Sequence, residues 1–291
     1  MVTIFSNPRP FEGPFNIIQR NAIRSWLKTC PKCEIILFND EEGTSVKIAK
    51  EFGVKCVTDV KCDEFGTPLL SDVFNKVRKL ASYDIVAQVN TDIILMDDFL
   101  EAIWNVKMVM GEKPFFMSGR RWNLEINEAI NFGKKNWESK LRDKIKKEGK
   151  LHGLSGMDYW VLPNNFLFEI PPFVIGRPGM DSWLVYKARS LKMPVIDATE
   201  MVNIIHQNHN YPRKKSSFFE IEKQRNLKLA GGFSNMCTLR DADWILTSGG
   251  LKRPPYPRRI FSALTLFYPW RLLLVFKRRL QKFLNEKEKL D

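Results

Sequence analysis

Short apolar runs alternate with amphipathic stretches over the first third of the chain. The apolar runs have the length of β-strands, and the stretches between them repeat apolar residues at helical spacing, as in 16–27. Strands that alternate with helices in this way are typical of βαβ units, so we predict a largely parallel sheet. Gly53 is expected to end the second helix. The expected strands span 2–6, 34–38, 54–57 and 85–89, and the expected helices span 16–27, 45–52 and 69–81.

The pattern becomes less regular after Asp92. A segment rich in Lys and Glu at 123–150 is expected to be a solvated helix, and helical spacing of apolar residues predicts another helix at 181–191. Further α/β structure is therefore expected around the same sheet, with strands at 159–162 and 201–205. The expected division is a catalytic domain at 1–250, with halves at 1–100 and 101–250, a boundary near 248–250, and a tail at 251–291.

The tail combines apolar and basic residues. Residues 260–276 form an apolar run that Pro269 and Arg271 interrupt, so it is too short and too polar for a spanning helix of about 20 residues. The chain carries a formal charge of +13, and residues 252–291 hold eleven Lys or Arg against three Asp or Glu, a net +8. An amphipathic helix with a basic rim is expected to lie on an anionic membrane surface. Packing on the domain and a homodimer contact are the alternatives, and nucleic acid is not an expected partner.

Composition and cysteine content set the expected compartment. Apolar residues make up 44% of the 291 residues, as in ordinary globular proteins, and the first residues show no secretory signal pattern. Five cysteines, an odd number, favour reduced thiols over a disulfide framework. Cys30 and Cys33 have zinc-knuckle spacing, which Cys56 and Cys62 would complete, but a second closely spaced pair is missing. We expect structural thiols and a cytoplasmic protein, peripheral at the inner face of a membrane.

The strongest local signal for chemistry is the polar triplet Asn90-Thr91-Asp92, directly after the strand expected at 85–89. Ligands of open parallel sheets bind beyond the carboxyl ends of the strands, where this triplet is expected to lie. A carboxylate there is suited to holding Mg²⁺ or Mn²⁺ against a diphosphate, because these ions share oxygen ligands with phosphate. A simple turn is the alternative, since Asn and Asp are common turn formers.

His206 and His209 are two of only three histidines, and they follow an expected strand at a spacing of three. The pair alone is a weak indicator of a metal, but it gains weight beside Asp92. Mixed oxygen and nitrogen ligands suit Mn²⁺ somewhat better than Mg²⁺. A zinc hydrolase is the alternative, although the H-E-x-x-H pattern is missing. The chain also lacks a phosphate-binding P-loop and a dinucleotide glycine fingerprint, which argues against an ATPase, kinase or dehydrogenase.

Several of these segments together resemble the GT-A fold glycosyltransferases, over roughly residues 2–232. The resemblance implies an α/β fold with a Rossmann-like, mostly parallel sheet flanked by helices. It also implies a nucleotide-sugar donor and a Mn²⁺ or Mg²⁺ cofactor. The segments that carry it are Thr3-Ile4-Phe5-Ser6, Phe38-Asn39-Asp40, Gly66-Thr67-Pro68-Leu69-Leu70, Val89-Asn90-Thr91-Asp92, Ile175-Gly176-Arg177, Met180-Asp181-Ser182-Trp183 and His206-Gln207-Asn208-His209.

The resemblance implies roles for the residues at the strand ends. In this family a D-x-D motif binds the metal and the donor, and this chain has Asn90 in place of the first Asp. Asn90 would then bond a ribose hydroxyl, and metal binding would rest mainly on Asp92. The backbone at Phe5 and Ser6 would line the base pocket, and Asp40 would accept a hydrogen bond from the base or ribose. For Asp40 a plain turn is the alternative.

Two carboxylates are candidates for catalysis. Inverting members of the family use an acidic residue at the start of a helix in the second half as general base, and Asp181 matches that place. A carboxylate suits this role because the acceptor hydroxyl must lose its proton as the new bond forms. Asp is also a favoured helix N-cap, so capping alone is the alternative. Asp158 is expected to bind hydroxyl groups of the donor or the acceptor, and is the competing candidate for the base.

The resemblance completes the expected site. A late His is a frequent metal ligand in the family, which implies His206 and His209 beside Asp92. Arg177 precedes the candidate base, and its planar guanidinium suits a diphosphate leaving group, with surface charge as the alternative. We therefore predict an inverting, metal-dependent glycosyltransferase that acts on a glycan or lipid-linked acceptor. A catalytically silent nucleotide-sugar-binding or scaffold protein is the alternative, because a fold alone does not establish activity.

Overall fold

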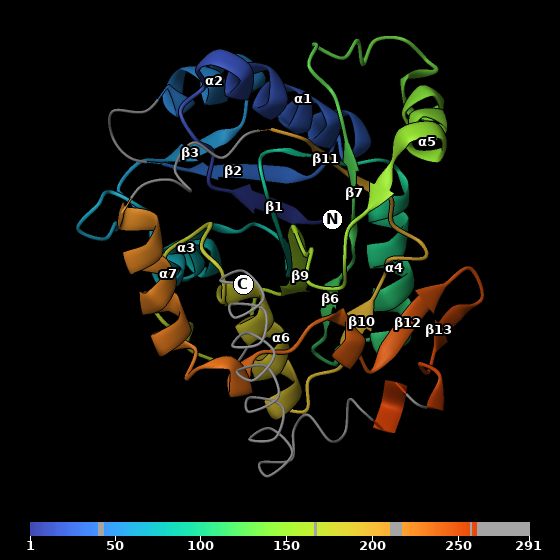
Figure 1. Cartoon of the computed structure of the whole chain (residues 1–291). Coiled ribbons are helices and arrows are strands. Elements are labelled where there is room, and N and C mark those ends of the chain that lie inside the picture. The colour runs from blue at the N-terminus through green and yellow to red at the C-terminus, as the bar shows by residue number, and fades with distance from the viewer. Residues whose placement is uncertain (40–43, 166–167, 210–216, 257, 261–291) are drawn as a thin grey trace, which may run out of the picture.

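A large twisted sheet with helices on both faces dominates the computed structural model, which describes residues 1–39, 44–165, 168–209, 217–256 and 258–260 (Figure 1). The strand order in this sheet is β13-β12-β10-β6-β9-β4-β1-β2-β3. The strands are β1 (Thr3–Ser6), β2 (Glu34–Phe38), β3 (Lys55–Val57), β4 (Ile85–Val89), β6 (Phe116–Ser118), β9 (Tyr159–Pro163), β10 (Val195–Asp197), β12 (Trp244–Thr247) and β13 (Gly250–Lys252).

Most neighbouring strands of this sheet are parallel. Strand β9 runs antiparallel to both β4 and β6, and β13 runs antiparallel to β12. Strands β4, β1, β2 and β3 form a parallel block, so their carboxyl ends share one edge of the sheet. Every residue of β1 and β4 is buried, as expected for strands that helices cover on both faces.

Apolar clusters hold the helices to the two faces of the sheet. One cluster joins α1, α2 and α4 to the first face and includes Trp26 and Phe99. The other joins α3 and α6 to the opposite face and includes Phe74 and Leu184. The helices are α1 (Gly13–Thr29), α2 (Ser45–Phe52), α3 (Leu70–Leu80), α4 (Asp98–Met110), α5 (Trp137–Glu148), α6 (Met180–Ser190) and α7 (Ser217–Leu229).

A second sheet, with the order β5-β11-β7-β8, lies beside the first. Helix α5 packs on it through Trp137, Leu141 and Ile145. Strand β5 follows β4 after a short turn and pairs with β11, which comes more than a hundred residues later. This pairing brings the end of β4 next to a late segment of the chain. The strands are β5 (Ile93–Ile94), β7 (Arg121–Leu124), β8 (Lys150–Leu151) and β11 (Ile204–Gln207).

The structure confirms the elements expected in the first third of the chain, apart from small shifts of their ends, and Gly53 ends α2 in a left-handed conformation. Three differences stand out in the second half. The segment at 123–150 is helical only in α5, and that helix buries one face instead of being solvated all round. The strand expected at 201–205 starts later, as β11. After Asp92, helices α4 and α7 and strands β5, β7, β8, β10, β12 and β13 were not expected.

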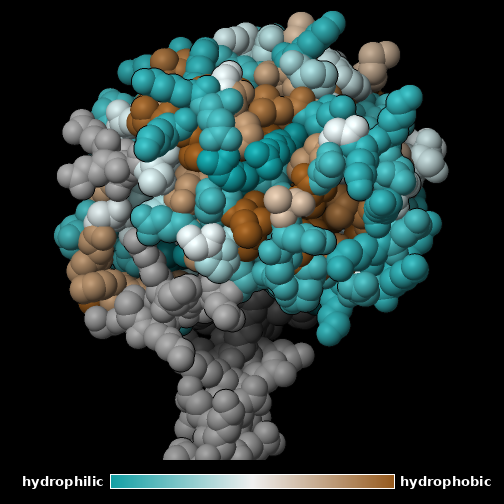
Figure 2. Space-filling view, turned by 90° about the horizontal axis from the view of Figure 1, so that it is seen from above, coloured by the Kyte–Doolittle hydropathy of each residue, from teal (hydrophilic) through white to brown (hydrophobic). Residues whose placement is uncertain are grey.

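The expected domain boundary at 248–250 falls in the turn of the β12–β13 hairpin, where Thr247 pairs with Gly250. The large sheet therefore continues to Lys252. The predicted tail lies largely outside the described residues, so its amphipathic helix stays a prediction. None of the described helices is both long and apolar enough to span a membrane. On the face seen in Figure 2, hydrophobic residues form separate patches among hydrophilic ones.

Candidate active site

Asparagines follow three neighbouring strands of the parallel block. Asn7, Asn39 and Asn90 come directly after β1, β2 and β4, so they share the carboxyl edge at which open sheets bind ligands. The Asn7 amide donates to the carbonyl oxygen of Phe38 at 3.3 Å, which ties the ends of β1 and β2 together. Asp40, predicted to contact the base or ribose, lies outside the described residues.

The side chains at the end of β1 are buried inside the protein. Phe5 is fully buried, with its ring edge-on to those of Phe38 and Phe74. Ser6 is also buried, and its hydroxyl donates to the carbonyl oxygen of Val89 in β4. The predicted role of the backbone at Phe5 and Ser6 in lining a base pocket stays a prediction.

The three predicted metal ligands meet at the junction of the two sheets. Asp92 precedes β5, and the pairing of β5 with β11 sets Ile93 opposite His206. The Oδ2 atom of Asp92 lies 3.4 Å from Nε2 of His206 and 3.0 Å from Nε2 of His209. One ligand atom from each of the three residues lies within 4.8 Å of the others. The strand pairing thus builds a three-residue cluster from two distant segments.

Asp92 and the two histidines shift one another's protonation through hydrogen bonds. Burial alone would raise the pKa of Asp92, but hydrogen bonds with His206 and His209 outweigh it and hold that pKa well below its usual range. Burial lowers the pKa of His206, and the hydrogen bond with Asp92 outweighs this and raises it. Asp92 Oδ1 is buried and has no hydrogen-bond partner among the described residues. A buried unpaired carboxylate oxygen is costly, and a cation bound by one carboxylate and two imidazoles would satisfy it.

A buried glutamine positions Asp92. The backbone N–H and the side-chain amide of Gln207 both donate to the carbonyl oxygen of Asp92, each at 3.1 Å. The Oε1 atom of Gln207 accepts from the amide of Asn21 at 3.0 Å, so α1 fixes the glutamine in turn. Sequence reasoning missed Gln207 as a positioning residue. Its signal was a polar residue next to a candidate ligand at the end of an apolar strand.

A second polar group, formed by Asn90, Asp158 and Arg121, lies at the end of β4. The Asn90 amide donates to Asp158 Oδ1 at 2.8 Å, and the Arg121 guanidinium donates to Asp158 Oδ2 at 2.6 Å. Arg121 also donates to Asn123 Oδ1 at 3.0 Å, and Asn123 lies opposite His206 in the pairing of β7 with β11. Arg121 therefore connects the predicted sugar-binding residues to the metal cluster, a connection that sequence reasoning did not find.

Asp181 lies in the first turn of α6, two residues after Gly179, which occupies the N-cap position. Because Gly179 is the N-cap residue, the interpretation of Asp181 as the N-cap residue is wrong. Burial and the nearby charge of Asp158 raise the pKa of Asp181 to about 8, although a backbone hydrogen bond and the charge of Arg121 act in the opposite direction. The raised pKa brings a carboxyl group into the range that suits a proton acceptor near neutral pH.

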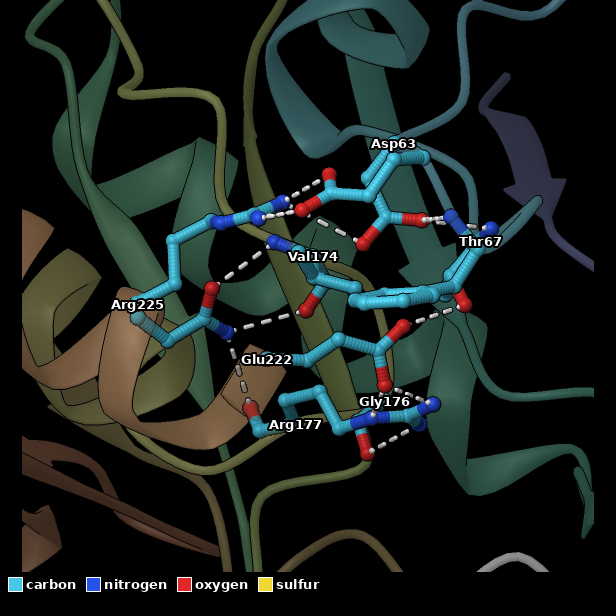
Figure 3. Close-up of polar contacts among 10 residues, drawn as sticks. Asp63, Thr67, Val174, Gly176, Arg177, Glu222 and Arg225 are labelled. Atoms are coloured by element: carbon cyan, nitrogen blue, oxygen red, sulfur yellow. Dashed lines mark hydrogen bonds and ion pairs between the residues drawn. The ribbon is translucent and has the colours of Figure 1, made fainter. Parts of the chain in front are cut away.

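Arg177 is held in a buried ion pair (Figure 3). Its Nε and Nη2 atoms each lie 2.6 Å from Oε2 of Glu222, and both side chains are almost completely buried. The other oxygen of Glu222 accepts from the Thr67 hydroxyl at 2.6 Å, and the Arg177 guanidinium lies over the Phe219 ring. The charge of Arg177 is thus already paired with Glu222, and its contact with a diphosphate stays a prediction.

Helix α7 ties together the two loops that carry Thr67 and Arg177. The Asn226 amide bonds both backbone groups of Val174, at 2.8 and 2.9 Å, and Arg225 pairs with Asp63 at 3.3 Å (Figure 3). The two loops also pair with each other through backbone hydrogen bonds. Because the second loop leads directly into α6, this network fixes the start of the helix that carries Asp181.

The alternative zinc site is not formed. Within the part of the chain that the structure describes, the cluster at Asp92 is the only group of three or more His, Cys, Asp or Glu side chains at metal-binding distances. Cys30, Cys33, Cys56 and Cys62 do not gather into such a group. The expectation of reduced thiols stays a prediction.

Solved structures of glycosyltransferases are similar to this chain. S. aureus TarS in complex with UDP-GlcNAc matches with a TM-score of 0.50 and 12% identity, over 80% of this chain and 72% of that chain. Glucosyl-3-phosphoglycerate synthase from Mycobacterium tuberculosis, in complex with Mn²⁺, UDP and phosphoglyceric acid, has a TM-score of 0.49 and 14% identity, over 79% of this chain and 78% of that chain. No family model matches the chain, and no curated protein matches it by sequence.

The similarity to TarS shows the fold alone, because the identity is only 12%. The chain has the GT-A fold, a mixed α/β architecture with a large, mostly parallel sheet between helices. The fold class predicted from the sequence is thereby confirmed. What the chain binds and which reaction it carries out must be argued from its own residues.

Proposed function

We propose that this protein is a metal-dependent glycosyltransferase that moves a sugar from a nucleotide-sugar donor to an acceptor hydroxyl. One observation carries the proposal. Asp92, His206 and His209 converge at the carboxyl edge of a GT-A sheet, and the buried Oδ1 of Asp92 has no hydrogen-bond partner among the described residues. That arrangement is suited to a divalent cation beside a diphosphate. The UDP-GlcNAc bound in the similar TarS structure supports a nucleotide-sugar donor.

The three ligands would hold Mn²⁺ or Mg²⁺ at the end of β4. Bound there, the cation supplies positive charge that stabilises the diphosphate as it leaves the sugar. The protein's contribution is the geometry, since Gln207 fixes the backbone of Asp92 and the β5–β11 pairing fixes His206. The two histidines must be neutral to bind the cation.

The donor is expected to bind along the carboxyl ends of β1, β2 and β4. The backbone at Phe5 and Ser6, together with Asp40, would hold the base and ribose. The sugar would lie near Asp158, whose carboxylate Asn90 and Arg121 hold in place. Hydroxyl groups are good donors to such a carboxylate.

Asp181 is the proposed general base of an inverting reaction. Its carboxylate accepts the proton of the acceptor hydroxyl while the acceptor oxygen bonds to the anomeric carbon. The bond from that carbon to the diphosphate oxygen breaks at the same time, and the nucleoside diphosphate leaves with the electron pair. Asp158 is close enough to raise the pKa of Asp181 and is the alternative base. The acceptor is a glycan or a lipid-linked hydroxyl.

A catalytically silent nucleotide-sugar-binding protein is the second candidate, and Asn90 favours it. An amide replaces the first acid of the D-x-D motif, and it donates to Asp158 instead of offering a carboxylate to a metal. Such a protein would bind donor without transferring its sugar.

The proposal is tested with a screen of UDP-, GDP-, CMP- and dTDP-sugars for Mn²⁺-dependent binding and for donor hydrolysis or transfer. Binding with turnover is expected for one donor class, and Asp92→Ala is expected to abolish the Mn²⁺-dependent part. Tight donor binding with no turnover would favour the silent protein. If no donor bound in the presence of Mn²⁺, both the glycosyltransferase and the silent nucleotide-sugar-binding protein would be contradicted.

We also propose that the tail places the enzyme at an anionic membrane surface, because residues 252–291 carry a net charge of +8 beside an apolar stripe. Full-length protein is expected to sediment with vesicles that contain phosphatidylserine at low salt, where charge attraction is least screened. A chain truncated after residue 260, which keeps strand β13 in the sheet, is expected to remain in the supernatant. Equal sedimentation of both proteins, or of neither, would make the tail a packing or homodimer element instead.

A further inference from the structure

A buried glutamine lies near the end of β4, two residues before Asn90. Gln88 is 5% exposed and is the one polar residue of this strand. Its amide donates to Asn90 Oδ1 at 3.0 Å. Burying an amide in a covered central strand is costly unless its polar groups are paired, so the presence of Gln88 calls for an explanation.

The hydrogen bonds around Asn90 fix which way each amide faces. The carboxylate oxygens of Asp158 can only accept, so the Asn90 group that lies 2.8 Å from Asp158 Oδ1 is its NH2 group. The Asn90 oxygen then faces Gln88, which offers its own NH2 group in return. The backbone N–H of Asn90 also donates to the carbonyl oxygen of Asp158, at 3.0 Å. A single carboxylate thus sets the orientation of both amides.

Gln88 leaves part of its own hydrogen-bonding capacity unused. Its Oε1 atom is buried and has no hydrogen-bond partner among the described residues. Trp160 lies opposite Gln88 in the pairing of β4 with β9, and within the same described part of the chain its buried Nε1 has no partner either. Buried polar groups without partners lower stability. Stability therefore does not explain a glutamine at this position, whereas the orientation of Asn90 does.

The fixed amide of Asn90 is suited to a hydroxyl group. One of its N–H groups and one lone pair of its Oδ1 stay without a partner among the described residues, and the side chain is partly exposed. A hydroxyl group both donates and accepts, so it matches either of these free positions. A cation at Oδ1, by contrast, would meet the positive end of the Gln88 N–H that already points at this oxygen.

We propose that Gln88 is the positioning residue that fixes the Asn90 amide, and that Asn90 held in this way bonds a hydroxyl group of the donor and is not a metal ligand. This inference rests on the proposed function, because it requires a nucleotide-sugar as ligand. It deepens that function by naming the residue that determines how the amide in place of the first acid of the D-x-D motif is used.

The test uses Gln88→Leu in the full-length protein, which removes the amide and keeps a side chain of similar size. UDP-glucose, GDP-mannose, CMP-sialic acid and dTDP-glucose are titrated by calorimetry in the presence of Mn²⁺. Affinity for the donor that binds the wild type is expected to fall about twofold to tenfold, the range for one neutral hydrogen bond. The melting temperature should equal or exceed that of the wild type, because the unpaired Oε1 is removed as well. A lower melting temperature with unchanged donor affinity would make Gln88 a structural residue and overturn the inference.

Asn90→Ala tests whether Gln88 acts through Asn90. This variant alone should lower donor affinity, and adding Gln88→Leu should lower it no further, because no amide is left to orient. A further loss of the size seen in Gln88→Leu alone would overturn the positioning role and leave the proposed function intact. The affinity for Mn²⁺ without donor, measured by electron paramagnetic resonance, should equal that of the wild type in both single variants. A severalfold loss in Asn90→Ala would make Asn90 a metal ligand and overturn that half of the inference.

Trp160→Phe is the matched control, because it changes the residue opposite Gln88 and removes a buried N–H without altering Asn90. It is expected to bind the donor as the wild type does. A loss of affinity equal to that of Gln88→Leu would reflect disturbance of the β4–β9 pair and would overturn the specific role of Gln88. Wild-type protein that binds none of the four donors in the presence of Mn²⁺ would contradict this inference and the proposed function together.

Discussion

Asp181→Asn is expected to lower the rate of sugar transfer by about 10²- to 10⁴-fold while leaving donor affinity close to that of the wild type. The amide cannot accept the proton of the acceptor hydroxyl, and general-base assistance contributes a factor of this size. The loss corresponds to roughly 3 to 5 kcal/mol of transition-state stabilisation. Steady-state transfer rates and donor titrations on the same preparations measure the two effects.

The raised pKa of Asp181 adds two dependences on pH. In the wild type, kcat/KM is expected to rise with pH until it levels near the pKa of about 8, because only the carboxylate is a base. The Asp181 carboxyl keeps its proton up to about pH 8 in the folded state but loses it at about pH 4 in the unfolded state. Because the folded state binds more protons in this range, this group makes the free energy of unfolding fall as the pH rises from about 4 to about 8. Asn does not titrate, so the Asp181→Asn variant does not lose stability in this way as the pH rises. The melting temperature of the variant relative to that of the wild type should therefore be higher at pH 8 than at pH 4.

Asp72→Asn is the matched control, since Asp72 lies in the first turn of α3 and is held by Lys76. Transfer should be unaffected, and stability near neutral pH should fall slightly instead of rising. Near-normal transfer by Asp181→Asn would eliminate Asp181 as the base and make Asp158 the next carboxylate to replace. A product with retained anomeric configuration would contradict direct displacement, whichever carboxylate proved essential.

Glu222→Ala is expected to have the largest effect on stability. The substitution leaves the buried Arg177 guanidinium without its carboxylate and removes the acceptor of the Thr67 hydroxyl. Removing one partner of a buried ion pair typically costs about 3 to 5 kcal/mol, because the remaining charge stays desolvated. Denaturant unfolding of wild type and variant measures the difference.

Glu64→Ala is the control for this substitution. Glu64 also pairs with an arginine of α7, Arg225, but both side chains are partly exposed. Ion pairs exposed to solvent contribute little to stability, so the loss should be small. Losses of equal size in the two variants would show that the Glu222 pair does not hold the loops to α7. Conversely, a large loss in Glu222→Ala together with slower transfer would connect that network to the placement of Asp181.

The parallel block of the fold could be predicted because its signals are local. Each strand from β1 to β4 is a short apolar run, and each helix between them has one apolar face. Helix α4 was not predicted from the sequence, and the reason is equally local. Its buried residues have helical spacing, but the exposed side chains of Trp104, Met108 and Val109 add apolar positions on the opposite side and obscure the pattern.

The meeting of Asp92, His206 and His209 could be anticipated, since a carboxylate after a central strand and a late histidine pair match the places of metal ligands that the resemblance to GT-A glycosyltransferases implies. The residues that position them could not. Gln207 reaches Asp92 across 115 residues of sequence, and Arg121 reaches Asp158 across 37. Both contacts depend on how strands pair in the two sheets, which no local pattern specifies. The pairing of Arg177 with Glu222 escaped for the same reason.

The central claim is that Asp92, with His206 and His209, holds a divalent cation that binds a nucleotide-sugar donor. Its most direct test is a calorimetric titration of the donor found by screening into wild type and Asp92→Ala, each with Mn²⁺ and with chelator. Wild type is expected to bind the donor at least a hundredfold more tightly with Mn²⁺, a difference of about 2.7 kcal/mol. Asp92→Ala is expected to bind it equally weakly in both conditions. Donor affinity that is independent of Mn²⁺ in the wild type, or Mn²⁺ dependence that persists in Asp92→Ala, would contradict the claim.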